Sequence, residues 1–339
     1  MALVQTLGLP QGIMRSMSTI SWNNDLKLIL SDVDDTIAET YTPAEPAMIA
    51  QLEKLLTGGC VLFLVSGGSL RRMQKGITDF LQPTARARVL ISHCSGAEVW
   101  GFAKDGALRP EPFYSLYDQT MTVVQQTAWR RVVAQLVEEF GLRTHPVRPK
   151  AIFWKDVGQD PHDVMFDDRG PQITLEVVNG TDLSDEQRAT FNMNIPVTHG
   201  QCDLRIAMLE RAQVLFTEAG LPVTPRLGGM FALDLALAGV SKTSSIQKAL
   251  ADQVVLESVG LTREDLQRPG CIEIWGDKFS AIRGGTDRHM SEAVDPEVRS
   301  IDFRDEDPSE FLAGYNTVLW QGKHRLHQGL LEYLHTRPQ

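Results

Sequence analysis

Two acidic residues follow a short apolar run near the start of the chain. The run at 26–30 leads through Ser31 into the sequence Asp32-Val33-Asp34-Asp35-Thr36. A carboxylate can act as a nucleophile toward phosphorus, as in the aspartyl-phosphate ATPases. We expect Asp32 to attack a phosphoryl group, and Asp34 to act as general acid and then as base toward water. The alternative for this motif alone is a solvated turn that caps a helix.

Such chemistry needs a cation, because a carboxylate and a phosphate dianion repel each other. Mg²⁺ prefers oxygen ligands and keeps several of its waters, so it can bridge a nucleophile and a phosphoryl group. Asp277, in Gly-Asp-Lys, and Asp287, in Gly-Gly-Thr-Asp, are the later acids that could complete such a site. The predicted cofactor is Mg²⁺, with Asp32, Asp34, Asp277 and Asp287 as its ligands.

A second group of residues could hold the phosphoryl oxygens. Ser66 follows the apolar run at 60–65, and Gly67 and Gly68 let the backbone come close to an anion. Lys242 lies at the start of an expected helix, where a lysine opposes the helix dipole. A fixed positive charge against a transferring phosphoryl group explains that position. Each feature alone could be an ordinary turn or a surface lysine, but the combination with the acidic residues is far more specific.

The elements around these residues alternate over the first hundred positions. The apolar runs and helical spacings predict strands at 26–30, 60–65, 89–92 and 97–102, and helices at 48–56 and 69–81. Alternating strands and helices are typical of a parallel, doubly wound α/β sheet. Ligands of such sheets bind beyond the C-terminal ends of the strands, so Asp32 and Ser66 should face one crevice.

The middle of the chain has a different pattern. It predicts helices at 118–140 and 204–219 and strands at 151–157 and 173–178, and the apolar run at 230–238 resembles a core element again. Later strands are expected at 271–275, 300–303 and 317–320, with a final helix through Leu334. We therefore expect an N-terminal extension at 1–24, a catalytic core at 25–102 and 228–339, and an inserted α+β domain at 103–227.

Composition restricts the classes of partner. The 339 residues carry a formal net charge of −10, which argues against nucleic acid. The absence of a run of about 18 apolar residues argues against a membrane span. The four cysteines lack C-x-x-C spacing, so we expect buried free thiols in a reducing compartment rather than zinc ligands. A cytoplasmic location follows, with an organelle presequence in the first 24 residues as the alternative.

These residues together resemble the haloacid dehalogenase superfamily of phosphotransferases. The resemblance implies a Rossmann-like core in which the first Asp is the nucleophile, the second the acid/base, and a terminal acidic pair binds Mg²⁺. The residues that match these positions are Asp32, Asp34, Ser66, Lys242, Asp277 and Asp287. The long insertion between Ser66 and Lys242 resembles the subclass with a large α/β cap there, which includes sugar-phosphate phosphatases.

Within that subclass the pattern is similar to the eukaryotic-type phosphomannomutases. The segments 65–69 and 95–98 resemble theirs, and Arg169-Gly170 resembles the sugar-binding region of their cap. Asp35 stands where a glycine is usual, and Arg169 alone has a clear counterpart among the basic residues of the mutase cap. The resulting prediction is a Mg²⁺-dependent phosphatase acting on a small phosphate monoester, a sugar phosphate. A phosphohexomutase is the alternative, and a non-catalytic sugar-phosphate binder a more remote one.

Overall fold

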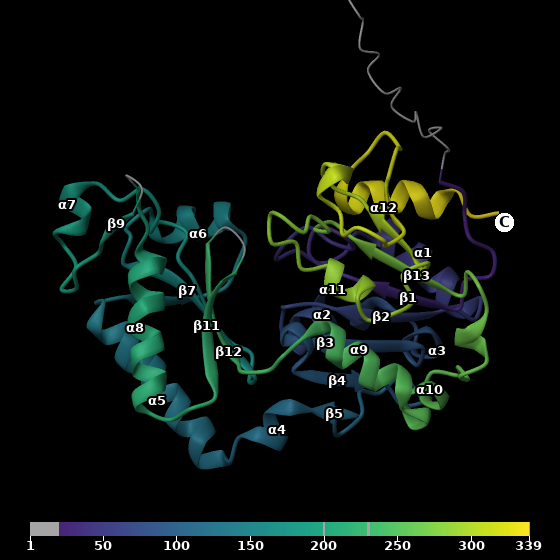
Figure 1. Cartoon of the computed structure of the whole chain (residues 1–339), viewed down its shortest axis with the longest axis horizontal. Coiled ribbons are helices and arrows are strands. Elements are labelled where there is room, and N and C mark those ends of the chain that lie inside the picture. Colours follow the sequence, from purple (N-terminus) through teal and green to yellow (C-terminus); the bar gives the residue numbers. More distant parts are fainter. Residues whose placement is uncertain (1–19, 199–200, 229–230, 339) are drawn as a thin grey trace, which may run out of the picture.

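The computed structural model describes residues 20–198, 201–228 and 231–338. They form two α/β units, each built on its own sheet (Figure 1). Most of the N-terminal extension expected at 1–24 lies outside the described residues. Its last residues lie on the core, where the Trp22 ring centroid is 5.3 Å from that of Tyr333.

The larger unit contains an eight-stranded sheet in the order β15-β14-β13-β1-β2-β3-β4-β5. Its first six strands are parallel, and β4 and β5 are antiparallel additions at one edge. The strands are β1 (Leu28–Ser31), β2 (Val61–Val65), β3 (Val89–His93), β4 (Glu98–Gly101), β5 (Tyr114–Ser115), β13 (Ile272–Gly276), β14 (Arg299–Asp302) and β15 (Thr317–Leu319). The doubly wound parallel sheet predicted from the sequence is confirmed.

Helices cover both faces of this sheet, because successive side chains of each strand point to opposite sides. One apolar cluster joins α1 (Pro46–Thr57), α2 (Leu70–Gly76), α3 (Pro83–Arg86) and α12 (Leu326–His335) to one face. A second cluster joins α9 (Lys242–Ala251), α10 (Gln253–Ser258) and α11 (Arg288–Ser291) to the other. Short 3₁₀ turns are η1 (Thr78–Phe80), η2 (Cys94–Gly96), η3 (Asp265–Gln267) and η4 (Pro308–Glu310).

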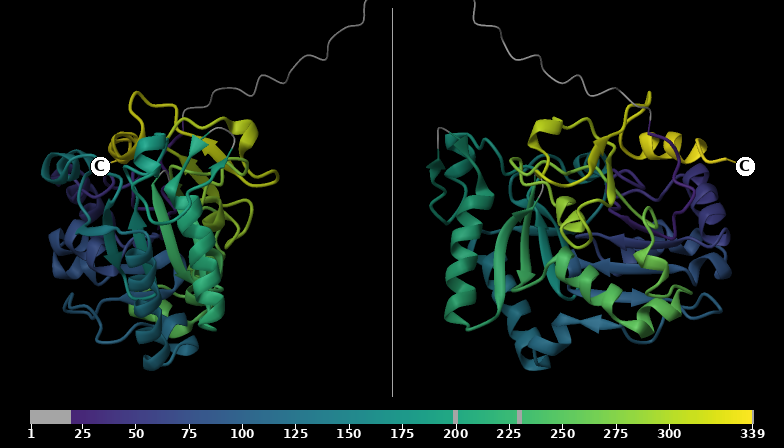
Figure 2. Two further views of the ribbon diagram at one scale, coloured as in Figure 1. Left: turned by 90° about the vertical axis from the view of Figure 1, so that its left-hand side faces the viewer. Right: turned by 45° about the vertical axis from the view of Figure 1, so that its right-hand side comes forward.

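The smaller unit is the inserted cap. Its five-stranded sheet has the order β11-β12-β8-β7-β6, with α5 and α8 packed on the face away from the core (Figures 1 and 2). The strands are β6 (Arg143–Pro146), β7 (Asp163–Asp168), β8 (Gln172–Glu176), β11 (Val223–Gly228) and β12 (Ala232–Leu237). The remaining elements are α4 (Leu116–Thr120), α5 (Val123–Glu139), α6 (Lys150–Val157), α7 (Asp185–Arg188), α8 (Leu204–Glu218), β9 (Val197–Thr198) and β10 (Gln201–Cys202).

The strand pairings place both boundaries of the cap later in the chain than expected. The strand β5 pairs with β4, so the core continues to Ser115 rather than ending at 102. The strand β12 pairs with β8 and β11, so the cap sheet extends to Leu237 and the core does not resume at 228. The run at 230–238 resembles a core strand because β12 is an interior strand of the cap sheet, with one face buried against α8.

Other differences are local. The strand expected at 151–157 is wrong: this segment is the helix α6, which follows Pro149 and buries Phe153 against the cap. The helix expected at 118–140 is divided into α4 and α5, because Thr122 and Gln125 form a capping box that starts a new helix. The helix expected at 69–81 ends at Gly76, before η1.

The chain crosses between core and cap twice, and both crossings lie beside one turn of the core. At the first, the Leu116 N–H donates to the Ala97 carbonyl at 2.8 Å. At the second, the Ser241 carbonyl approaches Gly96 so closely that a Cβ on Gly96 would lie 2.4 Å from it. Gly96 also has a φ of 103°, so glycine is required there for two reasons.

The four cysteines are free and buried, as expected. Among the described residues no helix is both long enough and apolar enough to cross a membrane.

Candidate active site

Three buried carboxylates meet at the C-terminal edge of the core sheet. Asp32 follows β1 and Asp277 follows β13, and these strands are parallel neighbours paired Leu28 to Ile272. Asp287 precedes α11, and its Oδ2 accepts the Asp277 backbone N–H at 3.0 Å. Each residue offers a carboxylate oxygen within 4.8 Å of the other two. The sequence-predicted acids of three separate segments thus form one cluster.

A buried lysine links two of these acids. Lys242 Nζ lies 3.1 Å from Asp32 Oδ1 and 3.0 Å from Asp287 Oδ1. Lys242 is the first residue of α9, which Ser241 caps through its side chain. The position that is unfavourable for the helix dipole therefore places a positive charge in the acidic cluster, and its contact with a phosphoryl group stays a prediction.

The three acids also destabilise one another. Burial, followed by the charges of Asp287 and Asp34, raises the pKa of Asp32 to about 7, although Lys242 opposes the shift. Burial and the charges of Asp287 and Asp32 raise the pKa of Asp277 to about 8. Oδ1 of Asp277 is buried without a hydrogen-bond partner. These residues fit a hard divalent cation, which would supply that oxygen with a partner and relieve the repulsion.

Asp34 lies outside this cluster of three. Its Oδ1 forms an ion pair with Arg72 of α2, and the Arg72 guanidinium lies 4.3 Å from the centroid of the Tyr41 ring. Among the described residues the structure thus brings together three of the four predicted metal ligands. The predicted proton-transfer role of Asp34 stays a prediction, now with Arg72 as its neighbour.

Asp35, which stands where the resemblance implies a glycine, has a positive φ of 63°. Asp and Asn are among the few residues that visit this left-handed region. Its Oδ1 accepts hydrogen bonds from the backbone N–H and hydroxyl of Thr40, both at 3.2 Å. Its Oδ2 lies 3.2 Å from Arg304. The extra negative charge of Asp35 is therefore hydrogen-bonded by Thr40 and paired with Arg304.

The loop after β2 is held against the turn after β3. The buried Ser66 hydroxyl accepts the Gly68 N–H at 3.0 Å. The Ser95 N–H donates to the Ser66 carbonyl at 3.0 Å, and the Cys94 N–H donates to the Gly68 carbonyl at 3.1 Å. Because β1 and β2 are parallel neighbours, this loop lies at the same sheet edge as Asp32, as expected.

The chain is similar to solved structures but not to known sequences. No protein-family model matches the chain, and no curated protein matches its sequence. A trehalose-6-phosphate phosphatase related protein superposes with a TM-score of 0.51 at 14% identity, over 91% of this chain and 96% of that one. The C-terminal domain of the trehalose-6-phosphate phosphatase of C. albicans gives 0.51 at 10% identity, over 91% of each chain. The chain has the haloacid dehalogenase fold.

In the described part of this haloacid dehalogenase fold, hydrogen bonds join the cap to the core. Arg169 Nη1 donates to the Gly67 carbonyl at 2.7 Å, Arg226 Nη2 donates to Ser95 Oγ at 3.1 Å, and the Tyr41 hydroxyl donates to Glu176. Arg169 is buried and its Nε is also bound to Asp167 at 2.7 Å. The predicted substrate-binding arginine thus connects the cap to the glycine loop, and its contact with substrate stays a prediction.

Several neighbours of the site carry no signal in the sequence. Arg72 and Arg304 approach the acids from segments distant in sequence, and Arg226 and Glu176 reach the core from the cap sheet. Only the position of Arg72, shortly after the Ser66 loop at the start of a helix, could have drawn attention to it.

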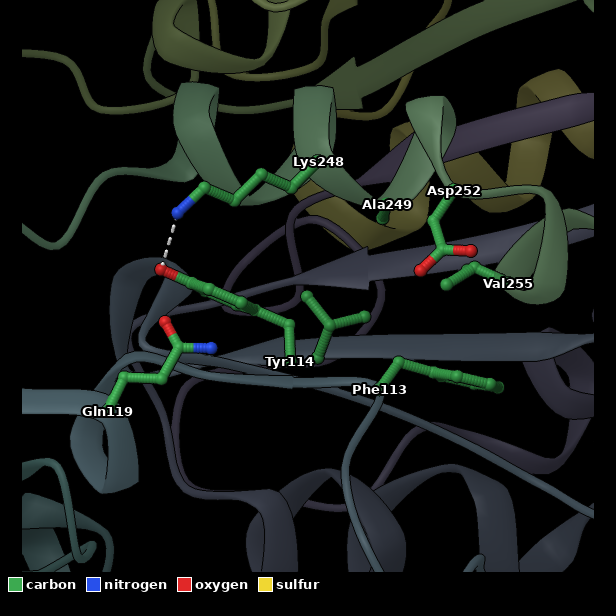
Figure 3. Close-up of a pocket in the computed structure, with 8 residues that line it drawn as sticks. Phe113, Tyr114, Gln119, Lys248, Ala249, Asp252 and Val255 are labelled. Atoms are coloured by element: carbon green, nitrogen blue, oxygen red, sulfur yellow. Dashed lines mark hydrogen bonds between the residues drawn. The ribbon is translucent and has the colours of Figure 1, made fainter.

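A pocket of about 320 Å³ lies elsewhere on the core, between β5 and the helices α9 and α10. Figure 3 shows Tyr114 and Lys248 joined by a hydrogen bond at its rim. None of the predicted site residues lines it. This pocket is therefore separate from the acidic cluster.

Proposed function

We propose that this protein is a Mg²⁺-dependent phosphatase that hydrolyses a small phosphate monoester, a sugar phosphate, through an aspartyl-phosphate at Asp32. The observation that carries the proposal is the cluster of Asp32, Asp277 and Asp287 around Lys242 at the end of the parallel strands. These three acids would hold Mg²⁺, which when bound offsets the charge of the carboxylates and of the phosphoryl group.

The proposed reaction has two steps. A carboxylate oxygen of Asp32 attacks phosphorus, and the bond to the leaving oxygen breaks while Asp34 gives that oxygen a proton. Asp34 then takes a proton from a water molecule that attacks the same phosphorus, which breaks the acyl-phosphate bond and releases inorganic phosphate. Lys242, the Ser66 hydroxyl and the backbone N–H groups after it would hold the phosphoryl oxygens in both steps.

Charge pairing at the cap interface favours hydrolysis over the mutase alternative. A phosphohexomutase must hold a second phosphate at the far end of its substrate, which calls for available positive charge. Among the described residues, Arg169 and Arg226 reach the core from the cap, Arg72 lies against the Tyr41 ring, and each of the three faces a carboxylate. The pairs are Arg72 with Asp34, Arg169 with Asp167, and Arg226 with Asp234, the last at 3.9 Å. This balance suits an uncharged leaving group better than a second anion.

The polar face of the cap sheet is evidence for a leaving group that carries hydroxyls. Asp167, Thr174, Asp234 and Arg226 are paired in register across β7, β8, β12 and β11. The Thr174 hydroxyl donates to Asp234 Oδ1 at 2.7 Å. Carboxylates, hydroxyls and guanidinium groups are hydrogen-bonding partners for sugar hydroxyls.

The test is phosphate release from a panel of hexose phosphates, a hexose bisphosphate and nucleoside monophosphates, with Mg²⁺ or with EDTA. We expect release from a hexose monophosphate with Mg²⁺, none with EDTA, and none from the Asp32→Asn variant. No release from any compound by the folded protein would sink the proposal.

Two other outcomes identify the alternatives. Conversion of mannose 1-phosphate into mannose 6-phosphate, stimulated by a hexose bisphosphate and without steady hydrolysis, would establish the mutase. Binding of a sugar phosphate that Asp32→Asn leaves unchanged, without turnover, would establish a non-catalytic binder.

A further inference from the structure

Arg304 contacts the acidic cluster from the turn after β14, a segment that contains none of the predicted site residues. It lies two residues after β14, which pairs with β13 so that Asp302 is opposite Gly276. The turn after β14 therefore lies beside Asp277. The Arg304 backbone N–H donates to Asp302 Oδ1 at 2.8 Å, which fixes the start of this turn.

The guanidinium of Arg304 binds the carbonyl oxygen and one carboxylate oxygen of Asp277. Nε donates to Asp277 Oδ2 at 2.9 Å and to the Asp277 carbonyl at 3.1 Å, and Nη2 also contacts Oδ2. Nη2 lies in addition 3.2 Å from Asp35 Oδ2. Forked contacts of this kind restrict the orientation of a carboxylate as well as neutralising it.

The other carboxylate oxygen of Asp277, Oδ1, is the buried atom without a hydrogen-bond partner. We propose that Arg304 is a positioning residue of the metal site, holding Asp277 by Oδ2 so that Oδ1 is presented to the cation. The inference rests on the proposed function, because it assumes that the acidic cluster binds Mg²⁺. Contacts of this type around a metal ligand typically change metal affinity by 10–100-fold.

The same guanidinium explains how the chain tolerates Asp35. An acid in place of a glycine adds a negative charge to a motif that already carries Asp32 and Asp34. Arg304 joins Asp35 to Asp277 and so balances this charge without occupying Oδ1 of Asp277. Its role is therefore distinct from that of Lys242, which contacts the other two acids of the cluster.

A simpler role for Arg304 predicts the opposite effect on the metal. If Arg304 were only a counter-ion for the acids, its positive charge would compete with Mg²⁺, and its removal would strengthen Mg²⁺ binding. If it positions Asp277, its removal weakens Mg²⁺ binding although a repulsive charge is lost. The sign of the change therefore separates the two roles.

The experiment is calorimetric titration of the full chain with Mg²⁺, with the Mg²⁺-induced rise in melting temperature as a second readout. The variants are Arg304→Gln and Arg304→Lys. The matched control is Arg283→Gln, because Arg283 pairs with Glu310 at 2.8 Å and contacts none of the clustered acids. We expect about 10-fold or more weaker Mg²⁺ binding in Arg304→Gln. Arg304→Lys should be intermediate, because lysine keeps the charge but not the fork, and Arg283→Gln should match the unaltered protein.

Stronger or unchanged Mg²⁺ binding in Arg304→Gln overturns the positioning role and leaves the proposed phosphatase intact. Full affinity in Arg304→Lys also overturns it, because charge alone would then suffice, and this variant decides the question if Arg304→Gln does not fold. Absence of Mg²⁺ binding by the unaltered protein overturns the proposed function together with the inference.

Discussion

Lys242 neutralises part of the negative charge that the acidic cluster buries. Asp32 and Asp287 are buried together, and Lys242 is the buried cation within hydrogen-bonding distance of both. Its desolvation lowers the pKa of the ammonium group, but the two carboxylates outweigh that effect and raise it. Lys242 is therefore charged in the folded protein at neutral pH.

Replacing Lys242 with methionine should therefore destabilise the metal-free protein as well as abolish turnover. Removing one partner of a buried ion pair typically costs about 3–5 kcal/mol, because the remaining charge is left uncompensated. The free energy of unfolding in EDTA, from urea denaturation, measures this cost. The double variant Lys242→Met/Asp32→Asn should recover part of the loss, and equal stability of the Lys242→Met variant and the unaltered protein would contradict the account.

The residues that the sequence revealed are those adjacent to a strand end or a helix start. Asp32, Ser66, Lys242 and Asp277 could be located because topology brings such positions to one edge of a parallel sheet. Arg304 could not be found, because its partners, Asp35 and Asp277, come from two other segments and its own surroundings, Phe303 and Asp305, form no motif.

At the scale of elements, the start of α9 depends on the absence of a side chain at Gly96. The Ser241 carbonyl that begins α9 and the Ser245 hydroxyl in its first turn both lie where a Cβ of Gly96 would be. Since Lys242 follows Ser241 directly, the turn after β3 sets the position of Lys242.

Gly96→Ala should therefore lower both stability and activity, and Gly239→Ala supplies the control. Both glycines have positive φ, so both variants carry backbone strain of about 1–2 kcal/mol. Only Gly96 has neighbouring atoms within contact distance of the added Cβ, whereas Gly239 has open space. The melting temperature and the phosphatase rate should fall further in Gly96→Ala, and equal losses in the two variants would show that strain alone acts.

The contact between Tyr41 and Glu176 joins the core to β8 of the cap. Glu176 is buried, so Tyr41→Phe leaves its carboxylate without this donor. We expect this loss to weaken the association of the cap with the core by about 1–3 kcal/mol. Hydrogen exchange of the β8 amides should become faster and KM should rise. Tyr114→Phe, which removes a hydroxyl contact to Lys248 within the core, should change neither. Unchanged β8 exchange in Tyr41→Phe would contradict the contact's role.

Element types were predictable where side-chain periodicity is set by burial on one face. The helix α8 buries residues four apart, such as Leu204 and Met208, and was predicted. The helix α6 was predicted as a strand because apolar and aromatic residues at 151–154 fill one turn, and only Phe153 among them is buried. The cap boundary was misplaced because β12 is buried like a core strand, and no local signal says which sheet it joins.

For the whole molecule, the acidic cluster links stability to pH and to metal. In the folded protein the pKa of Asp32 is about 7 and that of Asp277 about 8, above the unfolded value of about 4. The folded state therefore binds more protons than the unfolded chain between about pH 4 and 8, so the metal-free protein loses stability as pH rises through this range. Under the proposed function, Mg²⁺ would bind the deprotonated acids and restore that stability.

The expected result is a larger stabilisation by Mg²⁺ at pH 8 than at pH 5.5. At a concentration 100 times its Kd, Mg²⁺ should add about 2.7 kcal/mol to the free energy of unfolding. Calorimetric melting with Mg²⁺ and with EDTA at both pH values measures the difference. A matched titration with K⁺ controls for ionic strength, and an equal or larger Mg²⁺ effect at pH 5.5 would contradict the prediction.

Both chain crossings into the cap lie beside Gly96 and Ala97. An inserted segment whose two ends lie close together can be replaced by another, because its removal leaves only a short gap to close. The cap is such a segment. In this protein Asp32, Lys242, Asp277 and Asp287 lie outside that segment, and the polar face of the cap sheet lies inside it. Under the proposed function, a different insert joined at Ser115 and Ser241 should change the substrate and leave the chemistry at Asp32 unchanged.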